Sequence, residues 1–185
     1  MSDNFKSIFL TEQKDLLKQL LGSSIVDMNR HFDESPEKNS AFFDGPLTDI
    51  FQLVCEPLTI RFDSGLIIRI TSAGEFYSLT VRIQKTVEGN ISPEYTLFIE
   101  KNNFLISIKD EKYSHPEVAK NVLNKKISEI FILKATPLYE LRREYGLAFI
   151  TEDNYLMIIM NDGADLNVHF DKESVYQGTE WIPVK

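Results

Sequence analysis

Cysteine, tryptophan and histidine are scarce in this 185-residue chain, which contains one Cys, one Trp and three His. The single cysteine, Cys55, excludes an internal disulfide and is typical of a protein kept in a reducing compartment. No apolar run approaches the roughly 18 residues that a membrane-spanning helix needs. The first residues also lack the basic stretch and apolar run of a secretory signal. We therefore expect a cytoplasmic protein that does not associate with a membrane.

The common catalytic motifs are lacking as well. The chain has no glycine-rich phosphate loop, no Gly-x-Ser-x-Gly, no His-Glu-x-x-His and no Cys-x-x-Cys. Basic charge is in the minority, with 28 acidic residues against 20 basic ones and a formal net charge of -8. Because phosphate contacts need a basic surface, direct binding to nucleic acid is not expected. The sequence predicts no cofactor.

Apolar alternation with a period of two is what the chain has in abundance, and it predicts a mostly antiparallel sheet. The clearest examples are two hairpins, at residues 58–70 and 147–160. Shorter alternating runs occur at 50–55, 76–83, 127–133 and 164–170, and the runs 95–99 and 104–108 are predicted to pair as a further hairpin. Two short helices are expected, one from Thr11 to the stop at Gly22 and one beginning at Pro116. The fold class is therefore α+β, in a single domain spanning 1–185.

The two hairpins belong to a longer pattern that repeats along the chain. Leu58 and Leu147 are 89 positions apart, whereas Leu21 and Leu123, which precede the matched strands, are 102 apart. The long polar stretch at 32–46 in the first copy accounts for the difference. We therefore predict an internal duplication of a helix, strand and hairpin unit, with pseudo-repeats at 11–85 and 114–171.

Two stretches are candidates for contact with a partner. The first is the loop at 32–46, because loops of this length inside compact domains are usually functional or mobile, and it carries Phe42, Phe43 and Asp44. The second precedes the repeated hairpin and combines tyrosine with arginine, the residue types enriched at binding hot spots. Its candidate contact residues are Tyr139, Glu140, Arg142, Arg143 and Tyr145.

A different pattern suggests an alternative, which is a small-molecule or metal-dependent enzyme. Asp165, Asn167, His169 and Asp171 alternate with apolar residues, so they share one face of a predicted strand. Histidine and carboxylate side chains are metal ligands, but no second histidine lies nearby in sequence. We expect the wet face of an amphipathic strand here, with His169 not a metal ligand.

Small size, acidity, a mostly antiparallel sheet and the lack of catalytic motifs together favour a noncatalytic protein-binding module. In these class properties the chain is similar to bacterial immunity proteins, which bind and neutralise a toxin domain; no sequence motif carries the resemblance. The negative charge favours a protein partner with a basic surface. A structural or oligomerisation module is a third reading.

Overall fold

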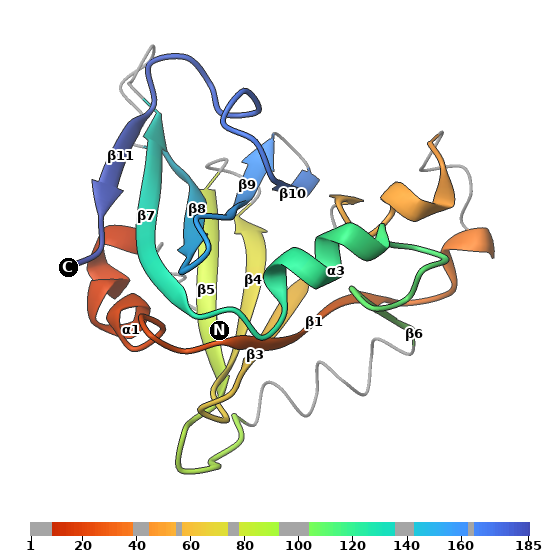
Figure 1. Cartoon of the computed structure of the whole chain (residues 1–185), viewed down its shortest axis with the longest axis horizontal. Helices are drawn as coiled ribbons and strands as arrows, with labels where there is room; N and C mark the ends of the chain where they lie inside the picture. The colour runs from red at the N-terminus through yellow and green to blue at the C-terminus, as the bar shows by residue number, and fades with distance from the viewer. Residues whose placement is uncertain are drawn as a thin grey trace, which may run out of the picture.

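The computed structural model describes residues 9–38, 45–54, 57–73, 78–92, 104–135, 143–162 and 165–185. The strands in these ranges are β1 (Ile25–Phe32), β2 (Leu53–Val54), β3 (Leu58–Phe62), β4 (Ile67–Ala73), β5 (Ser78–Lys85), β6 (Phe104–Ser107), β7 (Ile127–Ala135), β8 (Arg143–Thr151), β9 (Leu156–Asp162), β10 (Asp165–His169) and β11 (Glu180–Pro183). They form a five-stranded sheet of order β5-β4-β3-β1-β6 and a six-stranded sheet of order β11-β7-β8-β9-β10-β2 (Figure 1). All of the strand pairs are antiparallel, which confirms the predicted α+β class.

The helices of the described residues are short. They are the α-helices α1 (Lys14–Lys18) and α3 (Pro116–Val122) and the 3-10 helices η1 (Leu10–Gln13), η2 (Pro36–Lys38) and η4 (Leu47–Asp49). As predicted, Pro116 occupies the first turn of α3, where its missing N–H leaves no helical bond unmade. Gly22, with φ of +78°, follows α1 in the left-handed region that glycine adopts readily. None of the helices in the described ranges is long and apolar enough to cross a membrane.

One hydrophobic core contains the buried faces of both sheets. The alternation predicted from the sequence places Ile60 and Ile68 of the five-stranded sheet in this core with Leu147, Phe149 and Ile159 of the other. Each of these five side chains is at most 1% exposed. Burying a side chain of this size contributes about 1.5–3 kcal/mol, so the facing sheets supply the main stabilisation of the fold.

A second apolar cluster covers the opposite face of the six-stranded sheet. Its buried members are Leu133, Tyr145, Ala148, Ile158 and Met160, and partly buried residues such as Val175 and Trp181 pack against them. The segment 170–179 and β11 therefore close the outer face of β8, which is buried on both sides.

The same contacts occur in the two halves of the chain. The Gly22 N–H donates to the Ile127 carbonyl at 2.8 Å, and the Asn124 N–H donates to the Ile25 carbonyl at 2.7 Å. Both partners are shifted by 102 residues, from 22 to 124 and from 25 to 127. Asn124 also shares the positive φ of Gly22, with a value of 60°. The strand orders β5-β4-β3-β1 and β10-β9-β8-β7 of the two sheets also match strand for strand.

The hairpin turns of the two halves correspond through the spacing of 89 residues. The Phe62 N–H donates to the Leu66 carbonyl, and the Thr151 N–H donates to the Tyr155 carbonyl, each at 3.0 Å. Phe62 and Thr151 are 89 residues apart, as are Leu66 and Tyr155. Each hairpin then turns through a residue of positive φ, which is Gly65 in the first half and Asn154 in the second.

Several strand predictions were wrong in extent. The run 50–55 was predicted as a strand, but of its described residues, 50–54, only β2 is extended, because turn hydrogen bonds from Ile50 to Leu47 and from Gln52 to Asp49 fold the chain before it. β1 continues to Phe32, where the loop was predicted to begin. The predicted strand at 95–99 lies outside the described residues, and its predicted partner β6 pairs with β1.

Candidate functional site

Three loop segments come together at one end of the molecule, at the right of Figure 1. They are residues 33–38, 45–53 and 109–117, and we call this surface the acidic end. The segments contain seven Asp or Glu residues against three lysines. The first segment, together with residues 45–46 of the second, belongs to the long loop that the sequence predicts as a binding element.

Side-chain contacts hold the three segments together. Nε2 of His115 lies 2.8 Å from Oδ1 of Asp49, which joins the start of α3 to η4. The Lys112 ammonium donates to the Glu37 carboxylate and ties the third segment to η2. This hydrogen bond lowers the pKa of Glu37, to which a second hydrogen bond from Ser35 contributes, so the carboxylate stays charged.

Backbone and core contacts fix the acidic end to the sheets. The Phe51 N–H donates to the Tyr113 carbonyl at 3.0 Å. From β1, the fully buried Arg30 donates through Nε to the Phe51 carbonyl at 2.9 Å and through Nη2 to the Leu166 carbonyl of β10 at 2.6 Å. The guanidinium therefore connects the five-stranded sheet, the six-stranded sheet and the base of the acidic end.

The acidic end also exposes apolar side chains. Leu47 and Leu53 are each 42% exposed, although leucine is a residue type most often buried. Asp33, Glu34, Asp110 and Glu111 are exposed on the same surface. Protein interfaces combine exposed apolar area with charged residues, so this surface is suited to a partner of opposite charge.

Most of the contact residues predicted from sequence lie outside the described residues. This applies to Phe42, Phe43, Asp44, Tyr139, Glu140 and Arg142. Arg143 is described only by its backbone, as the first residue of β8. The described segments on either side of Phe42, Phe43 and Asp44 end at Lys38 and restart at Gly45. Both segments belong to the acidic end.

Tyr145 requires a correction, because it is only 2% exposed and cannot serve as a surface anchor in this conformation. A bulge in β8 sets its direction: Leu133 pairs with Gly146 and Lys134 with Glu144, so Tyr145 has no partner residue in β7. Its ring turns to the second apolar cluster instead of following Leu147 into the main core.

The Tyr145 hydroxyl holds in place the segment 170–179, which covers the Tyr145 ring. Thr179 Oγ1 donates to the Tyr176 carbonyl at 2.7 Å, so the Tyr145 hydroxyl donates to Thr179 across 2.6 Å. Burial raises the pKa of Tyr145 above its ordinary value. Tyr176 packs on the Tyr145 ring with centroids 5.2 Å apart and is itself 48% exposed. The exposed aromatic residue of this region is thus Tyr176, which the sequence reasoning missed.

The face predicted for the alternative enzyme site is only partly wet, because Asn167 is buried, His169 is partly buried and Asp171 is exposed. Asn167 is only 8% exposed, in β10, which lies between β9 and β2. Asp171 lies beyond β10, where its Oδ1 accepts hydrogen bonds from the N–H and hydroxyl of Ser174. The side chain of Asp165 lies outside the described residues. Among the side chains that are described, no group of three His, Cys, Asp or Glu residues is placed to hold a metal ion.

Comparison of the chain with protein-family models, with curated proteins and with solved structures finds no match in any of the three. A function is therefore proposed from the chemistry of the acidic end itself.

Proposed function

We propose that this protein is a noncatalytic protein-binding module whose acidic end docks on a basic surface of its partner. Its most concrete form is an immunity-type protein that binds and neutralises a toxin domain. The observation that supports the proposal is the acidic end, where an excess of carboxylates accompanies two half-exposed leucines on a loop surface held by side-chain contacts.

Charge and apolar area have separate roles in this proposal. Exposed carboxylates on a chain of net charge -8 attract a cationic partner and raise its association rate, an effect that salt screens. Leu47 and Leu53 supply apolar area that is removed from water on docking, which slows dissociation. The contacts of His115 and Lys112 hold the loops in place before binding, which reduces the entropy lost on association.

The test compares two charge-reversal variants in partner capture from the source cell. The first is Glu34→Lys with Glu111→Lys in the acidic end, and the control is Asp15→Lys with Glu129→Lys, which makes the same change in net charge elsewhere. All four side chains are exposed. We expect one protein with a basic surface to be captured by wild type and control, and to be lost from the acidic-end variant.

The captured protein then decides between a general binding module and an immunity protein. Produced alone it should arrest growth, and produced together with the wild-type chain it should not. Equal capture by both variants would place the interface elsewhere. A captured partner without toxicity would retain the binding module and reject the immunity role.

A further inference from the structure

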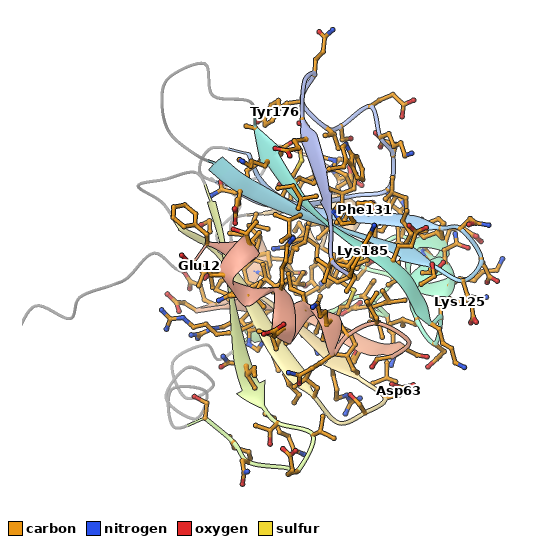
Figure 2. All side chains as sticks on the ribbon, turned by 90° about the vertical axis from the view of Figure 1, so that its left-hand side faces the viewer. Glu12, Asp63, Lys125, Phe131, Tyr176 and Lys185 are labelled. Atoms are coloured by element: carbon orange, nitrogen blue, oxygen red, sulfur yellow. The ribbon has the colours of Figure 1, made fainter. Side chains whose placement is uncertain are left out.

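A small depression of about 320 Å³ lies in the segment that follows β10. Its described lining residues are Lys172, Val175, Tyr176, Gly178, Thr179 and Trp181. Figure 2 shows the side of the molecule that carries Tyr176 and Phe131, and the acidic end is at the opposite end of Figure 1. The depression is therefore separate from the proposed docking surface, and its ligand chemistry is independent of that surface.

The walls of the depression are preformed. Asp171 accepts two hydrogen bonds from Ser174, and the Val175 N–H donates to the Lys172 carbonyl at 3.1 Å. Thr179 is held by the Tyr145 hydroxyl described above. Each of these bonds fixes the segment without a ligand, so binding there requires little ordering of the chain.

The chemistry of the lining combines an aromatic wall with a single cation. Nζ of Lys172 lies 5.7 Å from the centre of the Trp181 ring, and Phe131 supports this ring edge-on at 5.8 Å. Tyr176 offers a second, half-exposed aromatic surface. Lys172 is the only charged residue among the described lining residues, in a chain that is acidic as a whole.

We infer that this depression binds small aromatic carboxylates, with the flat apolar part against Trp181 and Tyr176 and the carboxylate at the Lys172 ammonium. The volume of about 320 Å³ is at the lower end of the range for small-molecule sites, roughly 300–1,000 Å³. Aromatic rings stack on one another in offset or edge-on geometry, and the ammonium supplies the complementary charge. A cationic ligand is disfavoured, because it would meet Lys172.

Phenylacetate is a suitable probe, and phenylacetamide is its neutral counterpart of the same shape. Trp181 is the single tryptophan of the chain, so its indole N–H gives one NMR resonance at the site itself. We expect phenylacetate to shift this resonance saturably with a dissociation constant on the order of 1 mM, as its few atoms allow. Phenylacetamide should bind about fivefold more weakly, in keeping with the modest strength of exposed charge pairs.

The variant Lys172→Met should weaken phenylacetate binding about fivefold and leave phenylacetamide binding unchanged. The matched control is Lys120→Met, which removes an exposed lysine of α3 and should change neither affinity. In the wild type, added salt should weaken binding of the acid and not of the amide, which tests the charge without any substitution. A saturable shift that is equal for acid and amide would overturn the carboxylate assignment. No saturable shift with phenylacetate would overturn the site.

Discussion

Ser24 and Lys126 form a single antiparallel bridge that joins the first half of the chain to the second. Beside this bridge, each residue donates its backbone N–H to an acidic side chain of the neighbouring hairpin turn. Ser24 donates to Oδ1 of Asp63 at 3.1 Å, and Lys126 donates to Oε1 of Glu152 at 3.4 Å. The junction of the two halves therefore depends on two equivalent carboxylates, of which the first makes the shorter bond.

Replacing these carboxylates should destabilise the protein unequally. We expect Asp63→Ala to lower the free energy of unfolding by about 1–2 kcal/mol, because it removes the acceptor of a part-buried N–H. Glu152→Ala should cost about 0.5 kcal/mol, since its bond is longer and exposed. Urea unfolding followed by circular dichroism measures both values. Equal losses of unfolding free energy would show that the two hydrogen bonds contribute equally, contrary to their distances.

Arg30 should not tolerate replacement by lysine. Its Nε and Nη2 donate in two directions to the carbonyls of Phe51 and Leu166, and a single ammonium cannot satisfy both. A buried carbonyl without a donor costs about 1–3 kcal/mol, so Arg30→Lys should lower the unfolding free energy by about 2 kcal/mol. The control is Arg61→Lys, because Arg61 is half-exposed and pairs with Asp27 at 3.7 Å. It should cost less than about 0.5 kcal/mol.

Gly146 is required where β8 passes between β7 and β9. A Cβ added at this position would lie 2.9 Å from Leu133 Cδ1 and 3.2 Å from Met160 Cβ. Gly146→Ala should therefore cost about 1–3 kcal/mol through overpacking. Thermal unfolding of Gly146→Ala in the wild-type and Leu133→Ala backgrounds tests whether Leu133 causes this loss of stability. The smaller alanine side chain at position 133 makes room for the added methyl group. An equal cost in both backgrounds would show that Leu133 is not the obstacle.

The hairpins were predictable from sequence because their information is local. The alternation in β3, β4, β8 and β9 indicates both the strands and their buried faces. The same alternation fails at Tyr145, since a bulge adds one residue to β8 and reverses the direction of this side chain. A period of two contains no sign of an inserted residue.

The acidic end was only partly predictable. The sequence indicated a polar loop after β1, but it did not indicate that residues 45–53 and 109–117 join it. Their association depends on the contacts of His115 with Asp49 and of Lys112 with Glu37, residues 66 and 75 positions apart. The exposure of Leu47 and Leu53 follows from the same tertiary arrangement, whereas their residue type alone predicts burial.

His31 should make stability depend on pH in a defined window. The imidazole is 1% exposed, and its Nε2 lies 2.8 Å from the Thr59 hydroxyl. Burial, with a smaller contribution from the positive charge of Arg69, lowers the pKa of His31 from 6.5 to about 4. Between these values the unfolded chain takes up a proton that the folded chain does not. The stability from neutral His31 is therefore fully present above pH 6.5 and is lost as the pH falls to about 4.

The shift corresponds to at most about 3 kcal/mol, at roughly 1.4 kcal/mol for each pH unit between the two pKa values. We expect His31→Gln, which keeps a polar group near Thr59, to lose less stability than the wild type as the pH is lowered through this window. Urea unfolding at a series of pH values measures the difference. His115→Gln is the matched control, because His115 is half-exposed and its removal leaves the buried imidazole in place. Parallel pH profiles for wild type and His31→Gln would mean that the folded protein accommodates a charged His31, so that its burial is not what limits stability in acid.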